Sequence, residues 1–260
     1  MLLAIDVGNT NIGFSIHDGE GFVANWRCAT VPDQTADEYF VWLRTLLGSM
    51  DSPVRTDSID RVIVSSVVPQ VLFNICIFCD RYLGFPPLVV GQPDCRLGIE
   101  VRVDIGTEVG ADRIVNTVGA YDRYGGDLVV VDFGTATTFD VVDHDGAYIG
   151  GVIAPGVNLS VEALHRAAAA LPRIDVSVPD RVIGTNTRMC MRSGVFWGYI
   201  GLIEGVTTRI REERGRPMKV VGTGGLAALF RRGTGVFDVV DSDLTMYGLI
   251  LIDEFNRTAE

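Results

Sequence analysis

The 260-residue sequence predicts an α/β protein made of two copies of one unit, each a mixed five-stranded sheet flanked by helices. Residues 2–16 read as a buried apolar strand, a tight turn and a second strand. Residues 128–142 repeat this order half a chain later. After both copies, apolar strands alternate with helical segments, which is typical of sheets covered by helices.

The repeated segment places an acidic residue at the same point of each copy. Asp6 aligns with Asp132 and Gly8 with Gly134, and an Asp-Gly hairpin signal follows in both copies. Any two buried hairpins resemble each other, and a single copy would leave that interpretation open. Two copies with the same acid at the strand end favour duplication, with halves at residues 1–125 and 126–260.

The first half shows five strands and two helices. Thr35 and Glu38 have the spacing of a capping box, and Pro69 is suited to the first turn of a helix. The expected strands cover residues 2–6, 11–16, 22–30, 61–68 and 87–90, the helices cover 36–47 and 69–83, and a loop covers 48–60.

The second half follows a glycine-containing segment, 95–113, and a helix over 114–124. Its apolar stretch at 195–200 favours ordinary core, with a dimer surface as the alternative. The expected strands cover 128–132, 138–142, 147–154, 219–222 and 236–240, and the helices cover 159–171, 187–211, 226–230 and 244–255.

Composition excludes several classes of protein. The net charge is −11 and Lys219 is the single lysine, so no basic stripe for nucleic acid exists. A protein this acidic needs a cation to bind a triphosphate. The sequence shows neither a signal peptide nor 18 uncharged apolar residues in a row, so we expect a soluble cytoplasmic protein without membrane contact.

The cysteines and histidines indicate neither a disulfide framework nor a zinc site. The five cysteines are an odd number spread through the chain, and the three histidines lack ligand spacing. Cys76 and Cys79 form a CxxC pair inside an apolar helical run. We interpret the pair as core packing, because a redox CxxC usually opens a helix after a strand.

Three glycine-containing segments could carry chemistry. The turn after Asp6 offers a carboxylate beside backbone amides, which suits a metal-bound phosphate, and the two acidic hairpins could grip a triphosphate from both sides. Residues 110–113, GADR, place a possible base and a guanidinium at a helix start; the alternative is an Asp that only complements the helix dipole. Residues 222–227, GTGGLA, formally match a dinucleotide motif but come too late for that fold, so we expect a turn beside adenine or ribose.

Other kinase and hydrolase motifs are missing from the sequence. No GxxxxGK[ST] segment occurs, and Lys219 lies within an expected strand, which excludes P-loop and protein-kinase chemistry. No GxSxG segment or plausible Ser/His/Asp set occurs either.

With these motifs the chain resembles the type III pantothenate kinases over essentially its whole length. The similarity rests on DVGNT at 6–10, GADR at 110–113, DFGTATT at 132–138, GGVIAPG at 150–156, IGTNT at 183–187 and TGGLA at 223–227. The resemblance implies duplicated ribonuclease H-like domains of the actin-like ATPase superfamily, which includes acetate and sugar kinases and Hsc70. It also implies transfer of the ATP γ-phosphate to the primary hydroxyl of pantothenate, the first step of coenzyme A biosynthesis.

The resemblance further implies a homodimer that needs Mg²⁺ and a monovalent cation, K⁺ or NH₄⁺. Asp112 would be the proton acceptor, Asp6 would help to place Mg²⁺, and Asp132 would bind the monovalent cation. The residues expected to contact ATP are Asp6, Val7, Gly8, Asn9, Thr10, Asn11, Ile12, Gly13 and Thr135, and those expected to contact pantothenate are Gly110, Ala111, Asp112, Arg113 and Thr187.

Two departures from the family pattern fall on the pantothenate side. Residues 103–107 lack the Tyr and the Asn-Pro pair of many relatives, and Thr185 replaces a common Lys.

Two other functions stay open: a nucleotide-binding regulator, which would not need Asp112, and an actin-like filament former, which the short chain disfavours.

Overall fold

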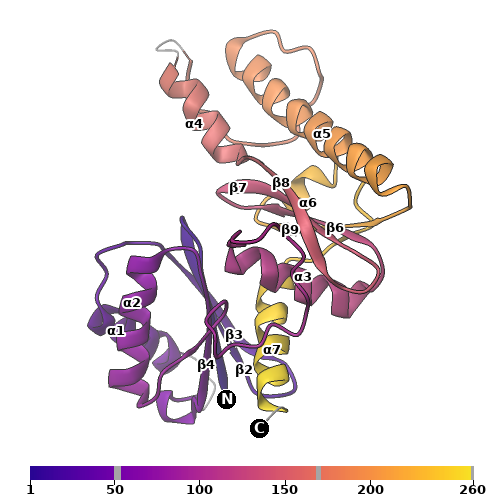
Figure 1. Ribbon diagram of the computed structural model, residues 1–260. Coiled ribbons are helices and arrows are strands. Elements are labelled where there is room, and N and C mark those ends of the chain that lie inside the picture. The colour runs from indigo at the N-terminus through magenta and orange to yellow at the C-terminus, as the bar shows by residue number, and fades with distance from the viewer. Residues whose placement is uncertain (50–53, 168–170, 259–260) are drawn as a thin grey trace. The chain divides into compact units, whose positions relative to one another are not determined.

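The computed structural model describes residues 1–49, 54–167 and 171–258, which form two compact units (Figure 1). Unit 1 comprises Met1–Gly98, Gly106–Gly119 and Thr245–Glu260, and unit 2 comprises Ile99–Ile105 and Ala120–Leu244. Both units are therefore discontinuous along the chain. The expected division into residues 1–125 and 126–260 follows the sequence repeat and stays a prediction.

Unit 1 contains a five-stranded mixed sheet in the order β3-β2-β1-β4-β5. The central strand β1 runs antiparallel to β2 and parallel to β4. The strands are β1 (Leu2–Val7), β2 (Asn11–His17), β3 (Phe22–Ala29), β4 (Arg61–Ser66) and β5 (Leu88–Val89), and the helical segments are α1 (Ala36–Gly48), a short 3₁₀ turn (Thr56–Ser58), α2 (Pro69–Phe78), a π turn (Cys79–Leu83), part of α3 (Ala111–Tyr124) and α7 (Leu244–Arg257).

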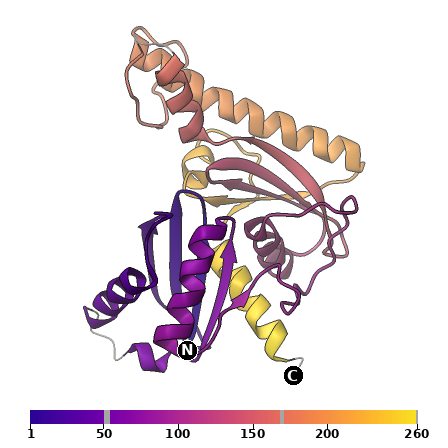
Figure 2. The same cartoon turned by 60° about the vertical axis from the view of Figure 1, so that its left-hand side comes forward.

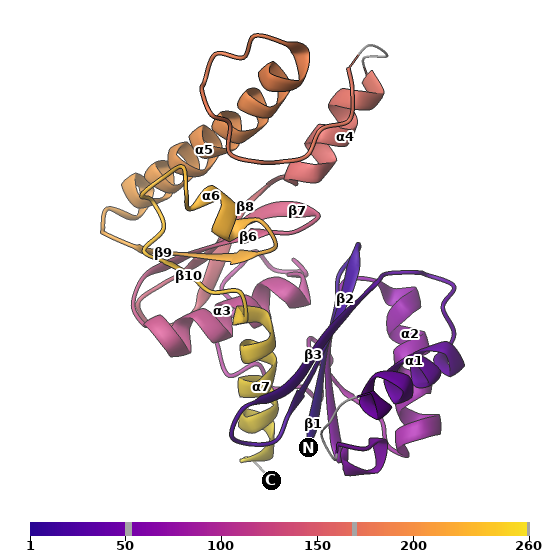
Figure 3. The same cartoon turned by 180° about the vertical axis from the view of Figure 1, so that it is seen from behind.

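Helices cover both faces of the unit 1 sheet. Helices α1 and α2 lie on one face and α7 on the other (Figures 1 and 3). Leu3, Ile5 and Val7 belong to the core cluster on the α1 and α2 side. Since side chains alternate along a strand, Leu2, Ala4 and Asp6 face the side of α7.

The sheet of unit 2 has the order β8-β7-β6-β9-β10. Its strands thus correspond one by one to β3-β2-β1-β4-β5 of unit 1. Strand β6 is antiparallel to β7 and parallel to β9, as β1 is to β2 and β4. The strands are β6 (Leu128–Phe133), β7 (Ala136–Val142), β8 (Tyr148–Pro155), β9 (Lys219–Gly224) and β10 (Val239–Val240), and the helices are α4 (Val157–Ala167), α5 (Thr187–Arg214) and α6 (Ala227–Phe230).

The long helix α5 lies along the unit 2 sheet (Figure 2), and its side chains contribute to the unit 2 core. Its side chains Phe196, Tyr199 and Ile200 are buried and pack in the same cluster as β6. The apolar stretch at 195–200 is therefore core, as expected. The helix begins with an Asn186 cap and ends at Gly215, whose φ of +64° lies in the left-handed region.

The matching strand order confirms the predicted duplicated fold. The capping box of α1 is also confirmed, since Thr35 Oγ1 accepts a hydrogen bond from Glu38 N while the Glu38 carboxylate accepts one from Thr35 N. Several predicted boundaries were wrong; for example, α3 begins at Ala111, β9 extends to Gly224, β10 covers only Val239–Val240, and α2 changes to a π turn at Cys79. Parts of the predicted 48–60 loop and 159–171 helix fall outside the described residues.

The expected core packing of the CxxC pair is confirmed for Cys79. All five cysteines are free, Cys79 is buried, and burial raises the pKa of its thiol to about 12. Cys76 is partly buried. Among the described helices, none is both long and apolar enough to cross a bilayer.

Candidate active site

The turn between β1 and β2 is exposed but held in place by hydrogen bonds. Gly8 N donates to Asn11 O at 3.0 Å, and Thr30 Oγ1 donates to Gly8 O at 2.6 Å. Thr30 N also donates to Thr10 O at 3.0 Å. Asn9, Thr10 and Asn11 are exposed at its tip. This turn therefore presents backbone and side-chain polar groups to solvent in a fixed shape, as a phosphate site requires.

Asp6 is the penultimate residue of β1, just before this turn. The residue is half-buried, and its Oδ1 atom is shielded from solvent. Its register partners are Gly13 on β2 and Ser65 on β4. A Cβ at Gly13 would lie 2.5 Å from Met246 Cε, so the Met246 side chain of α7 packs directly on β2 here. The carboxylate is thus placed at a strand end beneath a close-packed helix.

Asp112 lies in the first turn of α3, where the fold keeps its carboxylate in a defined position. Its Oδ1 accepts a hydrogen bond from Arg113 N at 2.8 Å. A Cβ at Gly110 would lie 2.7 Å from this oxygen, which gives the glycine a packing reason. Burial raises the pKa of the Asp112 carboxyl, an effect that the hydrogen bond and the Arg113 charge only partly offset. A carboxylate with a raised pKa is a better proton acceptor than an ordinary Asp.

Within unit 1, Val67 links the Asp6 strand to residues 110–113. Val67 N donates to Val7 O at 3.1 Å, which attaches the residue to the end of β1. Its Cγ1 lies 3.7 Å from the position of a Cβ at Gly110. The two expected motifs of this unit therefore share one packing neighbour. No local sequence pattern indicates this role of Val67, because strand pairing is a non-local feature.

The second acidic turn, in unit 2, repeats the geometry of the first. Gly134 N donates to Ala136 O at 3.0 Å, as Gly8 N does to Asn11 O. Asp132 is half-buried, and Thr135 is exposed at the tip. A Cβ at Gly156 would overlap Thr135 O, so the start of α4 packs directly on this turn.

Gly222 and Gly224 are strand residues of β9, and the expectation of a turn beginning at Gly222 was wrong. A Cβ at Gly222 would lie 3.0 Å from the Phe237 ring. A Cβ at Gly224, whose φ is +85°, would overlap Asp132 Oδ1. These glycines are thus required by packing, and Gly224 leaves room for the Asp132 carboxylate. Contact of this segment with adenine or ribose stays a prediction.

Thr187 is the first residue of α5 and is exposed. Asn186 caps the helix by accepting a hydrogen bond from Met189 N at 3.0 Å. A Cβ at Gly184 would overlap Cys190 N, so the chain crosses close to the first turn of the helix. Thr185 is exposed, and Ile105 in the departing 103–107 segment is fully exposed. The ligand roles of all these residues stay predictions.

Within the described part of the chain, two polar groupings are formed by residues other than the expected ones. Asp143, His144 and Asp145 bring ligand atoms within 4.8 Å of one another, and Arg102 contacts Asp143 at 2.6 Å.

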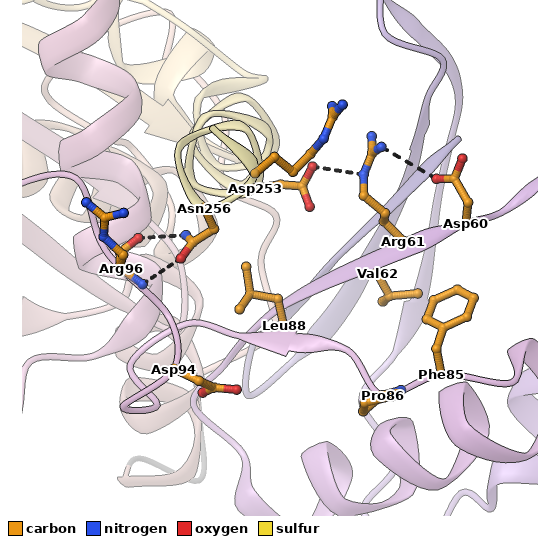
Figure 4. A pocket seen from close by; sticks show the side chains of 11 residues that line it. Asp60, Arg61, Val62, Phe85, Pro86, Leu88, Asp94, Arg96, Asp253 and Asn256 are labelled. Carbon is orange, nitrogen blue, oxygen red and sulfur yellow. Dashed lines mark hydrogen bonds and ion pairs between the residues drawn. The ribbon is translucent and has the colours of Figure 1, made fainter. Parts of the chain in front are cut away.

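In unit 1, a cavity of about 580 Å³ lies near Arg61, at the end of β4 remote from Asp6 (Figure 4). Its polar groups largely bind one another, since Arg61 Nε is 3.1 Å from Asp253 Oδ2.

Duplicated five-stranded sheets, each with an Asp at the end of its first strand, define the fold of the actin-like ATPases and their related kinases. The structure is similar to a ROK family glucokinase from Streptomyces griseus in complex with glucose and AMPPNP, with a TM-score of 0.52 and 12% identity over 99% of each chain. It is also similar to the ethanolamine utilization protein EutJ from Carboxydothermus hydrogenoformans, with a TM-score of 0.55, 16% identity, and 96% and 89% of the chains covered.

Comparison of sequences gives the family. The family model for type III pantothenate kinase matches residues 2–209. A type III pantothenate kinase from Dinoroseobacter shibae is 61% identical over 259 residues, covering 100% of both chains. Another from Jannaschia sp. is 62% identical over 257 residues, covering 99% of this chain and 98% of the relative. The chain belongs to the type III pantothenate kinase family.

Proposed function

We propose that this protein phosphorylates pantothenate. It transfers the ATP γ-phosphate to the primary hydroxyl and gives 4′-phosphopantothenate, the first step of coenzyme A biosynthesis. Membership of the family supports the substrates. The structural observation that carries the proposal is Asp112, a carboxyl of raised pKa held at a helix start next to Arg113. A protein that only binds nucleotide has no need of such a base.

The residues expected from the family resemblance have the following roles in this reaction. In unit 1, residues 6–13 bind the phosphates, and residues 110–113 bind pantothenate. Asp112 accepts the proton of the attacking hydroxyl, while Arg113 holds an anionic group of the substrate. Thr135 contacts ATP, Thr187 contacts pantothenate, and residues 222–227 lie beside the adenosine. General-base assistance of this kind contributes about 10²- to 10⁴-fold in rate.

Asp6 fits the divalent cation that accompanies ATP. Mg²⁺ prefers oxygen ligands and retains several of its waters, so one carboxylate at a strand end beside a phosphate turn is a suitable donor. When bound, Mg²⁺ neutralises charge that develops on the transferred phosphoryl group. The half-buried carboxylate of Asp6, next to the turn at Gly8, would hold the ion there.

Asp132 fits a monovalent cation, K⁺ or NH₄⁺. The Asp132 carboxylate and the Phe133 carbonyl oxygen both lie near Gly224, which gives two oxygen donors in one place. A net charge of −11 also favours a second cation where a triphosphate binds.

We further propose a cytoplasmic homodimer, as the family resemblance implies. Apolar residues exposed on the edge strand β8 and on α4, such as Ile153 at 64% and Leu159 at 52%, support a second copy as partner. Sedimentation velocity measures this directly. A monomer at micromolar concentration would contradict the dimer without affecting the proposed reaction.

The decisive experiment is ADP release with MgATP and pantothenate, in K⁺ and again in Na⁺ alone. Pantothenate-dependent ADP supports the reaction, and stimulation by K⁺ supports the cation role of Asp132. If ATP binds but no ADP forms with any cation, the protein is a nucleotide-binding regulator or uses another hydroxyl substrate. Residues 103–107 and Thr185 would then be examined first, since both depart from the family pattern.

A further inference from the structure

Ser65 is a buried hydroxyl whose position calls for a chemical reason. The residue is 0% exposed on β4, and its Oγ makes no hydrogen bond with any described residue. Leaving a buried hydroxyl unsatisfied costs about 1–3 kcal/mol. Alanine would fill nearly the same volume without this cost, so size alone does not account for serine.

Ser65 is the direct neighbour of Asp6 in the sheet. Strands β1 and β4 are parallel, and the register pairs Asp6 with Ser65. Paired residues of adjacent strands project to the same face, so both side chains face the side of α7. Asp6 Oδ1 is also shielded from solvent. A carboxylate and a hydroxyl thus lie side by side at the end of the sheet that carries the phosphate turn.

The duplicated unit gives an independent indication. Asp132 has Thr223 on β9 as its parallel register partner, in the place that Ser65 occupies beside Asp6. Thr223 is also buried, with 1% exposure. Both copies therefore place a hydroxyl residue beside the strand-end Asp. On the antiparallel side the copies differ, with Gly13 in one and Thr138 in the other.

We propose that Ser65 is a positioning residue for the divalent cation at Asp6. Its hydroxyl hydrogen-bonds a water of the cation's hydration shell, and it thereby sets where the Asp6 carboxylate holds the ion. The inference rests on the proposed function for the presence of that ion. Mg²⁺ retains most of its waters in proteins, so such outer contacts are a normal part of its sites.

The test is binding of Mn²⁺ in the presence of ADP, followed by electron paramagnetic resonance of the free ion. Ser65→Ala is expected to weaken Mn²⁺ binding by about tenfold, the lower end of the effect of outer contacts at metal sites. Tyr39→Phe is the matched control. Tyr39 is 0% exposed, its hydroxyl also makes no hydrogen bond with a described residue, and it belongs to α1, on the other face of the same sheet.

Each outcome supports or overturns the inference. Loss of Mn²⁺ affinity in Ser65→Ala, with Tyr39→Phe within twofold of the wild type, supports it. Equal affinity of wild type and Ser65→Ala overturns it and leaves the proposed reaction unaffected. Equal losses in both variants also overturn it, since the cause would be general. A wild type that binds no Mn²⁺ with ADP overturns both this inference and the proposed Mg²⁺ role of Asp6.

Discussion

Asp112 is the single residue on which the proposed chemistry depends most. Asp112→Asn keeps the hydrogen bond from Arg113 N but removes the proton acceptor. We expect kcat to fall by about 10²- to 10⁴-fold while ADP still binds. Steady-state kinetics and a nucleotide-binding titration measure the two effects. Unchanged turnover would remove Asp112 from the mechanism.

The raised pKa of Asp112 also predicts how rate depends on pH. The base must be ionised, so kcat/KM should fall as the pH drops through the raised pKa of Asp112, which lies above the ordinary 3.8. The acid limb of a pH–rate profile reports this value. A limb at or below 3.8 would show that burial does not perturb the carboxyl in the working enzyme.

The same shift predicts a gain of stability in Asp112→Asn. A raised pKa means that the folded state favours the neutral Asp112 carboxyl over the carboxylate. The stability that the neutral carboxyl contributes is therefore lost as the pH rises through the raised pKa, and the buried carboxylate destabilises the fold above it. At pH 7 the variant should therefore have a higher free energy of unfolding than the wild type. The difference should shrink as the pH falls below 3.8. Urea titrations at both pH values measure it, and lower stability of the variant at pH 7 would contradict the assignment.

Gly224 permits a test of how the fold holds Asp132. In Gly224→Ala the new Cβ overlaps Asp132 Oδ1, so we expect stimulation by K⁺ to be lost. Gly215→Ala is the control, because Gly215 also has a positive φ, +64°, but nothing lies within 4 Å of a Cβ there. Both variants carry backbone strain. Equal loss of K⁺ stimulation in both would show that strain, and not contact with Asp132, is the cause.

At the scale of elements, the cap of α5 links helix stability to the proposed substrate. Asn186→Ala removes the acceptor for Met189 N and should cost about 1 kcal/mol. Because Thr187 follows directly, KM for pantothenate should rise. Thr35→Ala removes a similar cap from α1 and should cost about as much without changing KM. Urea titration and kinetics compare them, and equal KM changes would contradict a role for Thr187.

The sequence predicted the helices and strands themselves better than it predicted which residues of different strands are neighbours in the sheets. The repeat of Asp6 and Asp132 was sufficient to predict two matching sheets, because strand periodicity and turn residues are local signals. The pairing of Asp6 with Ser65 was not predicted, since 58 residues of chain separate β1 from β4 at this point and no local pattern reports register. The start of α3 was missed for a related reason, because GADR reads equally as a loop.

At the scale of the whole molecule, α7 shows most clearly that the two units are not consecutive along the sequence. Residues 245–260 come last in the chain but belong to unit 1. The helix contributes the buried side chains Leu249, Ile250 and Ile252, and Asp253 pairs with Arg61 of β4. Deleting residues 245–260 should therefore abolish cooperative unfolding of unit 1. Retention of a sharp transition in urea would contradict this.

This arrangement also has a consequence for synthesis of the protein. A ribosome releases β1 to β5 long before α7, so unit 1 cannot be completed until α7 has been translated. Until then the Asp6 face of the sheet lacks its helix and remains open to chaperones or to premature association. A chain that terminates early would thus be recognisable to quality control by its uncovered first sheet, even where unit 2 had already folded.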